Sequence, residues 1–246
     1  MNYKDYVKWE RMPSTWCPGC AIGTIFKSLA YTLEKLSVPR EELVVVSGIG
    51  CSGRAAGYFD GDSVHTTHGR AVAVAEGIKR GNPALKVIVF SGDGDLVGIG
   101  GNHFLHTSRR DVDLTVVCVN NGIYGMTGGQ MAPTTPPGEK TLTSPRGTAF
   151  APINIQAIAT AGPRHFYARA SVYQVNHLQQ ALREAIEWPG FAFVDVMAFC
   201  LENFGRRLAF KSGHEMLFKV KADFKINPAP AGRLADNELG VVKHGH

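Results

Sequence analysis

The first regular feature of the chain is a helical spacing of apolar residues that begins just after Cys20. Ile22, Phe26, Leu29, Leu33 and Leu36 recur with a period close to the ~3.6 residues of an α-helix. The spacing ends at Val38-Pro39, because a proline cannot continue a helix. We therefore expect a helix over 22–36, opened by the Cys-Pro-Gly-Cys turn at 17–20.

Four later runs of apolar, often β-branched residues predict buried strands at 43–46, 86–90, 114–119 and 191–198. Segments with helical character lie at 71–79, 155–161 and 176–188, and the last of them has Asn176 and Gln179 spaced for a capping box. Near-continuous apolar strands that alternate with helices are typical of a mostly parallel sheet with helices on both faces. The pattern therefore predicts an α/β fold.

Two stretches have no usable periodicity. Residues 126–150 are crowded with glycine, proline and threonine, and structureless loops of this length are usually lids or binding loops. The tail from Asn227 onward has the composition of a poorly packed extension. We expect one domain over 1–225 and a C-terminal extension over 226–246.

Composition and charge narrow the possible functions. The 246 residues are 44% hydrophobic and only 19% charged, which excludes a wholly disordered chain. The net charge of +5 is spread along the chain instead of forming the basic stripe typical of nucleic-acid binding, so no nucleic-acid partner is expected. No apolar stretch approaches the roughly 18 residues that span a bilayer, and no secretory segment is evident. We expect a cytoplasmic protein that does not associate with membranes.

Polar side chains follow two of the predicted strands at the points where they end. Gly92-Asp93-Gly94 follows one strand, and Asn120-Asn121 follows the next. The carboxyl ends of parallel strands form the ligand-binding edge of such a sheet. Asp93, the Asn121 amide oxygen and the Ile123 carbonyl are suitable oxygen ligands for Mg²⁺, and the glycines allow backbone N–H groups to approach a diphosphate.

The five cysteines form an odd number and do not indicate a disulfide framework. Cys118 lies in the middle of a predicted strand and is interpreted as an isolated buried residue. The other four would come together if the start of the first helix and two strand ends converge, and four thiolates suit either a 4Fe–4S cluster or Zn²⁺. These four are Cys17, Cys20, Cys51 and Cys200.

The Gly-Asp-Gly motif with Asn-Asn at this distance resembles the diphosphate-binding motif of thiamine-diphosphate enzymes. Further motifs follow in collinear order from about Trp16 to Arg207: WCPGC, SGIGC, HTTHGRAVAVAEGIK, GDGDLVGIGGNHF, NNGIYGMTGGQ and CLENFGRR. Together they resemble the β subunits of the 2-oxoacid:ferredoxin oxidoreductases, most closely the 2-oxoglutarate branch. The resemblance implies a thiamine-diphosphate-binding domain of the diphosphate-binding type.

The resemblance also implies roles for individual residues. It favours a 4Fe–4S cluster over zinc, with Cys17, Cys20, Cys51 and Cys200 as the iron ligands, and it makes Asp93, Asn121 and Ile123 the Mg²⁺ ligands. The residues expected to bind the cofactor are Gly50, Cys51, His68, Gly69, Gly92, Asp93, Gly94, Asp95, Asn121, Ile123, Gly125, Met126 and Thr127.

The activity implied by this family is the CoA-dependent oxidative decarboxylation of a 2-oxoacid, with electrons passed through the cluster to ferredoxin. 2-Oxoglutarate is the preferred substrate, and pyruvate and branched-chain 2-oxoacids remain alternatives. A non-catalytic iron–sulfur or zinc scaffold is the alternative of another class. Because no glutamate lies at an obvious strand end, we expect the activating glutamate to come from an α subunit within an (αβ)₂ heterotetramer, and we expect activity only with that subunit.

Overall fold

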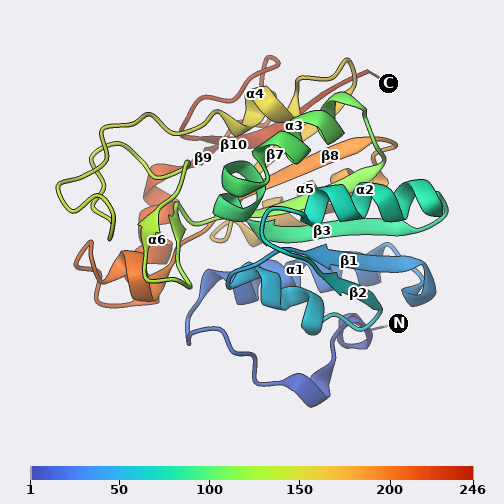
Figure 1. The fold of residues 1–246 in the computed structure, drawn as a ribbon, viewed down its shortest axis with the longest axis horizontal. Helices are drawn as coiled ribbons and strands as arrows, with labels where there is room; N and C mark the ends of the chain where they lie inside the picture. Colours follow the sequence, from blue (N-terminus) through green and yellow to red (C-terminus); the bar gives the residue numbers. More distant parts are fainter. Residues whose placement is uncertain (1, 246) are drawn as a thin grey trace.

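The computed structural model describes residues 2–245, and a single large sheet lies at its centre (Figure 1). Its strands are β1 (Leu43–Ser47), β2 (Asp62–His65), β3 (Lys86–Gly92), β4 (Leu114–Asn120), β7 (His165–Ser171), β8 (Phe191–Met197), β9 (Lys225–Ile226) and β10 (Glu238–His244). They are arranged in the order β2-β1-β3-β4-β8-β7-β10-β9. Every neighbouring pair is parallel except β7 and β10. The prediction of a mostly parallel sheet is confirmed.

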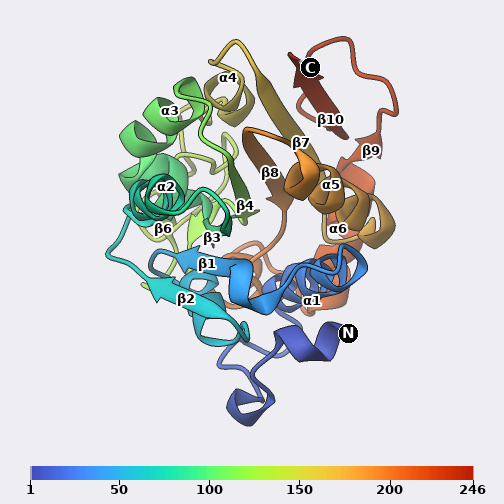
Figure 2. The same cartoon turned by 90° about the vertical axis from the view of Figure 1, so that its right-hand side faces the viewer.

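Helices cover both faces of this sheet (Figure 2). The helices are α1 (Ala21–Lys35), α2 (Ala71–Gly81), α3 (Gly101–Arg109), α4 (Ile155–Ala159), α5 (Val175–Glu187) and α6 (Gly213–Asp223). α1 and α5 pack on one face through residues such as Leu29 and Leu182, and α2 and α3 pack on the other through residues such as Val72 and Phe104. All seven residues of β4 are buried, which explains why this strand is apolar without alternation.

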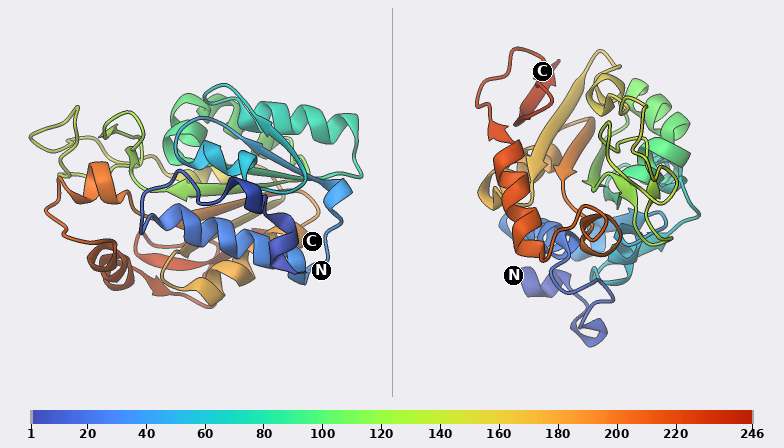
Figure 3. Two further views of the ribbon diagram at one scale, coloured as in Figure 1. Left: turned by 90° about the horizontal axis from the view of Figure 1, so that it is seen from below. Right: turned by 90° about the vertical axis from the view of Figure 1, so that its left-hand side faces the viewer.

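Short elements and one long loop lie at the carboxyl end of the sheet. A hairpin of β5 (Ile123–Tyr124) and β6 (Gln130–Met131) follows β4. The stretch expected to lack regular structure began at 126, but β6 lies within it, and only residues 132–150 contain no helix or strand. This loop and α6 gather at the same end of the molecule (Figures 1 and 3). The remaining short helices are 3-10 turns at Tyr3–Tyr6, Trp9–Arg11, Arg40–Glu42 and Ser52–Gly57, and π-helical turns at Gly94–Ile99 and Leu201–Gly205.

Two expectations about local structure were wrong. The predicted capping box at Asn176 does not form, because α5 already begins at Val175 and Gln174 occupies the N-cap without a side-chain hydrogen bond. The tail beyond 226 is not poorly packed, because β10 pairs with β7 and buries Leu239 and Val242 in the core. The apolar residues of this segment are few, so their burial is evident only once a neighbouring strand is in place.

Candidate active site

A pocket opens at the carboxyl end of the sheet, between the segments that follow β1, β3 and β4. Strand order reverses between β1 and β3, since β2 lies on one side of β1 and β3 on the other. Such a reversal leaves a crevice in which ligands of open α/β sheets bind. The pocket is lined by Ile49, Gly50, Cys51, Ser52, His68, Gly92, Asp93, Gly94, Asp95, Asn121, Ile123, Tyr124, Gly125, Met126 and Thr127.

Asp93 supplies a buried carboxylate to this pocket. Its Oδ2 accepts a hydrogen bond of 3.0 Å from the Gly122 backbone N–H and another from the Thr134 hydroxyl. Burial raises the pKa of Asp93 to about 6, although the hydrogen bonds from Thr134, Gly94 and Gly122 oppose that rise. A bound cation would reverse this effect by stabilising the charged form. The metal-free site therefore holds an unfavourable charge that a cation would neutralise.

The residues predicted to hold Mg²⁺ all face this pocket. Asp93, Asn121 and Ile123 line it together, and one carboxylate with two neutral oxygens is a donor set suited to Mg²⁺ that also binds a diphosphate. The Asn121 side-chain oxygen accepts a 3.2 Å hydrogen bond from the Ile123 N–H, which holds the turn after β4 in place. Close packing adds to the fit, because a Cβ on Gly94 would lie 2.3 Å from the Tyr124 ring.

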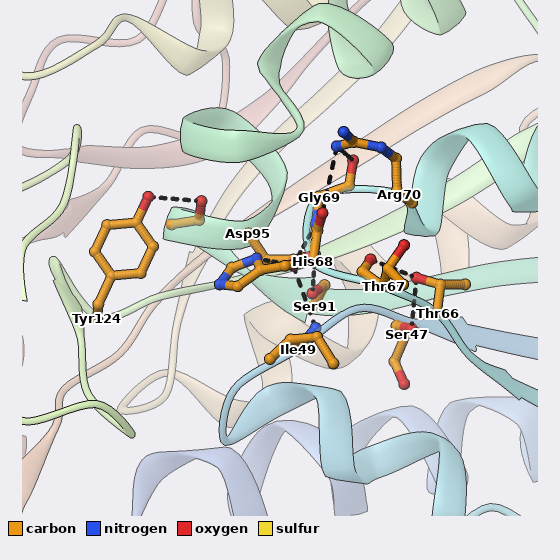
Figure 4. A network of polar contacts seen from close by, with 11 residues as sticks. Ser47, Ile49, Thr66, Thr67, His68, Gly69, Arg70, Ser91, Asp95 and Tyr124 are labelled. Atoms are coloured by element: carbon orange, nitrogen blue, oxygen red, sulfur yellow. Dashed lines mark hydrogen bonds and ion pairs between the residues drawn. The ribbon is translucent and has the colours of Figure 1, made fainter.

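A second buried carboxylate, Asp95, has its oxygens directed toward the protein. Oδ1 accepts hydrogen bonds from the backbone N–H groups of Gly69 at 2.7 Å and Ile49 at 3.2 Å, and Oδ2 accepts one from the Ser91 hydroxyl at 2.8 Å (Figure 4). Nδ1 of His68 lies 2.5 Å from Oδ1. Asp95 thus connects the segments after β1, β2 and β3, and its role is to organise the pocket wall.

Two glycines make this arrangement possible. A Cβ at Gly48 would lie 1.9 Å from Asp95 Oδ2, so only glycine allows the carboxylate to approach the end of β1. Gly69 has a φ of +73° and donates its N–H to the same carboxylate. Gly69 itself does not line the pocket, so its predicted part in cofactor binding is indirect in this structure.

The four cysteines predicted as cluster ligands lie near one another at the same end of the molecule. Burial raises the pKa of Cys20 to about 11, and the nearby thiols of Cys51, Cys17 and Cys200 contribute to that rise. Burial likewise raises the pKa values of Cys51 and Cys200, with neighbouring thiols adding to the effect. Within residues 2–245, no three histidine, cysteine, aspartate or glutamate side chains are grouped closely enough to hold a metal ion.

Cys118 lies outside this group. It is fully buried in β4, and its pKa is raised well above the ordinary value by burial and by Asp195, Asp93 and Asp95, with no contribution from another thiol. The interpretation of Cys118 as an isolated core residue therefore agrees with its position.

The group of four cysteines adjoins the pocket in two places. Cys51 lines the pocket directly, and its backbone carbonyl accepts a 2.8 Å hydrogen bond from the Trp16 indole. A Cβ on Gly125 would lie 3.1 Å from the Cys200 sulfur, and Asn203 donates to the Gly125 carbonyl at 2.6 Å. The cysteine-bearing loops and the candidate cofactor pocket therefore share one wall.

Sequence reasoning missed four residues of this site. Ile49, Ser52 and Tyr124 line the pocket, and the Thr134 hydroxyl binds Asp93 from the long loop. The first three lie beside predicted site residues, so extending each motif by one residue would have found them. Thr134 is separated from Asp93 by 41 residues, and no local signal marks it.

Comparison with known proteins decides the family. Residues 48–196 match the family described as "Thiamine pyrophosphate enzyme, C-terminal TPP binding domain". The chain is 50% identical over 199 residues to the 2-oxoglutarate synthase subunit KorB of Archaeoglobus fulgidus, with 81% of this chain and 74% of that protein aligned. The chain belongs to the β subunits of the 2-oxoacid:ferredoxin oxidoreductases. The predicted family resemblance is thus confirmed.

Other relatives agree with this assignment. The β subunit is 44% identical over 234 residues to KorB of Methanocaldococcus jannaschii, with 95% of this chain and 86% of that protein aligned. It also superimposes, with a TM-score of 0.87 and 30% identity, on a 2-oxoglutarate:ferredoxin oxidoreductase from Magnetococcus marinus solved with 2-oxoglutarate, coenzyme A and succinyl-CoA bound. That match covers 100% of this chain and 86% of the solved one.

Few charged side chains line the pocket of the β subunit. Among the described residues that line it, the acidic ones are Asp93 and Asp95, and there is no glutamate, arginine or lysine. Arg54, Arg70, Lys140 and Arg146 do not line it. No helix within residues 2–245 has the length and apolar character needed to cross a membrane.

Proposed function

We propose that this chain is the β subunit of a CoA-acylating 2-oxoglutarate:ferredoxin oxidoreductase that acts in the cytoplasm. The reaction converts 2-oxoglutarate and CoA into succinyl-CoA and CO₂ and releases two electrons and one proton. The observation that carries the proposal is the shared wall between the cysteine-bearing loops and a pocket that contains Asp93 and Asn121. The named relatives and the ligand-bound solved structure support 2-oxoglutarate as the substrate.

In this proposal the pocket holds thiamine diphosphate and Mg²⁺. The cofactor supplies the carbanion stabilisation that allows a 2-oxoacid to lose CO₂. Asp93, Asn121 and the Ile123 carbonyl would hold the metal, and the glycine-lined segments after β1 and β3 leave room for the diphosphate. Met126 and Thr127, which also line the pocket, would shape the space for the substrate.

The four cysteines Cys17, Cys20, Cys51 and Cys200 would hold a 4Fe–4S cluster. The raised pKa values of Cys20, Cys51 and Cys200 mean that cluster assembly has to displace protons from these thiols. Since Cys51 and Cys200 adjoin the pocket, a cluster held by them would receive electrons directly from the site of decarboxylation. Ferredoxin would then take the electrons from the cluster one at a time.

An α subunit would complete the active site, in an (αβ)₂ heterotetramer. Thiamine diphosphate requires a carboxylic acid beside its aminopyrimidine ring, and the described pocket wall contains no glutamate. A second substrate carboxylate favours an arginine or lysine partner, which this wall also lacks. The α subunit is therefore expected to supply the activating glutamate and the cation.

The test compares the isolated chain with its complex. Both are reconstituted without oxygen, with cluster, Mg²⁺, thiamine diphosphate and CoA, and reduction of an artificial electron acceptor is followed with 2-oxoglutarate, pyruvate and branched-chain 2-oxoacids. We expect turnover only by the complex, with the highest kcat/KM for 2-oxoglutarate. Sustained turnover by the isolated chain would contradict the role of the α subunit, and a preference for another 2-oxoacid would contradict the substrate.

A further inference from the structure

We propose that His68 is a catalytic acid–base residue of this site and that Asp95 is a positioning residue that orients it. The inference rests on the proposed function, because it assigns a proton-transfer role within the same 2-oxoacid reaction. It comes from the contact between the buried Asp95 carboxylate, whose oxygens already accept hydrogen bonds from the protein, and the His68 imidazole, which lines the pocket. Figure 4 shows this contact from close by.

Both oxygens of the Asp95 carboxylate already bind protein groups, so neither is available to a ligand. Asp95 is 3% exposed, and both of its oxygens already accept hydrogen bonds from Ile49, Gly69 and Ser91. These three donors belong to three different segments, so the carboxylate is held in one place. A buried, immobile carboxylate beside an imidazole is the arrangement that fixes the tautomer and orientation of a catalytic histidine.

His68 offers its other nitrogen to the pocket. Nδ1 lies 2.5 Å from Asp95 Oδ1, which makes Nδ1 the nitrogen that carries hydrogen and leaves Nε2 available for proton exchange. The contact is not an aligned hydrogen bond in this structure, and the ring would have to rotate to make it one. The side chain is 34% exposed, and the ring extends toward Tyr124 with its centre 6.1 Å from that ring (Figure 4).

No other group on the described pocket wall is as well suited to move a proton near neutral pH. Asp93 is assigned to the metal and Cys51 to the cluster, and the Tyr124 hydroxyl already donates to the Gly94 carbonyl. The Arg70 guanidinium donates to the backbone carbonyls of His68 and Gly69. Imidazole is the side chain that ordinarily exchanges protons between about pH 5 and 8.

The proton transfer balances over one turnover. With thiamine diphosphate bound, His68 Nε2 would give a proton to the carbonyl oxygen of the 2-oxoacid as the π electron pair of the C=O bond moves to that oxygen. After CO₂ has left and two electrons have been removed to the proposed cluster, the acyl C=O bond would form again from the O–H electron pair and the proton would return to Nε2. The proton of the CoA thiol would be released to solvent. His68 ends the cycle as it began, so no further reactant is needed.

The activity test uses the complete complex with its α subunit. His68→Gln keeps a hydrogen-bond donor but cannot exchange a proton, so we expect kcat/KM for 2-oxoglutarate to fall about a hundredfold or more. The fall of wild-type kcat/KM at rising pH should disappear in this variant. Asp95→Asn should lower kcat and leave KM near the wild-type value, because the imidazole is then less firmly oriented while the residues lining the pocket are unchanged. His65→Gln is the matched control, since His65 is exposed and does not line the pocket.

A second readout does not depend on turnover. Diethylpyrocarbonate modifies deprotonated imidazoles, and peptide mass spectrometry resolves His68 from His65. We expect thiamine diphosphate with Mg²⁺ to protect His68 and to leave His65 reactive. In Asp95→Asn, the cofactor should still protect His68, because the imidazole remains on the pocket wall.

The two readouts separate failure of this inference from failure of the proposed function. If the wild type turns over 2-oxoglutarate and His68→Gln does so at the same rate, the catalytic role of His68 is wrong and the proposed function still holds. Absence of turnover with every 2-oxoacid would overturn the proposed function, and protection from diethylpyrocarbonate would then decide whether His68 contacts the cofactor. Equal modification of His68 with and without cofactor would overturn the inference.

Discussion

The charge of Asp93 has opposite effects on the stability of the metal-free protein and on the proposed binding of Mg²⁺. Burial raises its pKa to about 6, so the metal-free protein favours the protonated form below that pH and loses stability as the pH rises through it. A shift of this size corresponds to a cost on the order of 3 kcal/mol above pH 6. The same charge is what a bound Mg²⁺ requires. Stability of the metal-free chain and affinity for the metal therefore oppose each other at this residue.

Asp93→Asn should separate these two effects. We expect the variant to have a higher free energy of unfolding than the wild type in the presence of a chelator above about pH 6, and the difference should vanish as the pH falls toward the ordinary value of 3.8. Affinity for thiamine diphosphate with Mg²⁺ should fall, because a charged ligand is lost. Urea unfolding and calorimetric titration measure the two effects, and unchanged cofactor affinity would contradict the metal assignment.

The cysteines allow a second prediction at the residue scale. Replacing Cys17, Cys20, Cys51 or Cys200 by Ala should each remove iron and visible absorbance from the anaerobically purified protein. Cys118→Ala is the internal control, because its buried thiol lies apart from the other four and its loss should affect only packing. Iron and sulfide analysis gives the result. A full iron complement in Cys200→Ala would show that the fourth ligand is a different residue.

At the scale of elements, α2 and α3 are joined by a buried glutamate. Glu76 of α2 accepts hydrogen bonds from Thr107 of α3, from Arg110 at the C-cap of α3, and from Arg80 one turn along its own helix. Burial opposes its ionisation, but the hydrogen bonds from Arg110, Thr107 and Arg80 outweigh that effect and lower the pKa of Glu76 to about 2. The interaction therefore stabilises the fold at pH values above 4.5, the ordinary pKa of a glutamate. This stabilisation is lost as the pH falls toward 2.

Glu76→Gln should lower the free energy of unfolding at neutral pH by on the order of 2 to 3 kcal/mol. The difference from the wild type should narrow below about pH 4.5, where the unfolded chain already binds the proton. Arg80→Ala is the control, since Arg80 is largely exposed and an exposed ion pair contributes at most about 1 kcal/mol. Equal effects of the two variants in urea unfolding would contradict the structural role of the pair between α2 and α3.

At the scale of the whole molecule, exposed apolar side chains surround the pocket mouth. Ile49 and Met126 lie on its wall, and Leu142 packs beside the same loop, where its N–H donates to the Gly129 carbonyl. Leu142 is 48% exposed. An α subunit that closes the active site would cover these residues, so the proposed assembly accounts for their exposure.

Leu142→Asp should weaken the association of the two subunits roughly tenfold to a hundredfold, the effect of losing one buried leucine side chain. Ile226→Asp is the matched control, because Ile226 is 46% exposed on the edge strand β9, away from the pocket. Sedimentation of the mixed subunits measures the association. If the control weakens the complex more than Leu142→Asp does, the interface lies at the other edge of the sheet.

How far the sequence predicts each element depends on how strong its local pattern is. β4 is buried on both faces and is apolar throughout, so its sequence identifies it. β2 has mostly exposed residues and β7 mixes polar with apolar ones, so neither carries a pattern of that strength. β10 becomes a core strand only because β7 offers an antiparallel edge against which Leu239 is buried. A local sequence pattern predicts an element when nearly all the side chains of that element are buried, as in β4.

The sequence by itself determined the α/β class and the placement of Asp93 and Asn121 at two strand ends, because each depends on residues close together along the chain. The choice of Cys17, Cys20, Cys51 and Cys200 as cluster ligands came instead from the resemblance to the family. Only the tertiary structure decided that Thr134 binds Asp93, that Asp95 faces the protein, and that His68 is left facing the pocket. Those contacts join segments that are distant in sequence. Side-chain direction and burial, which arise only when the strands are assembled into the sheet, determine them.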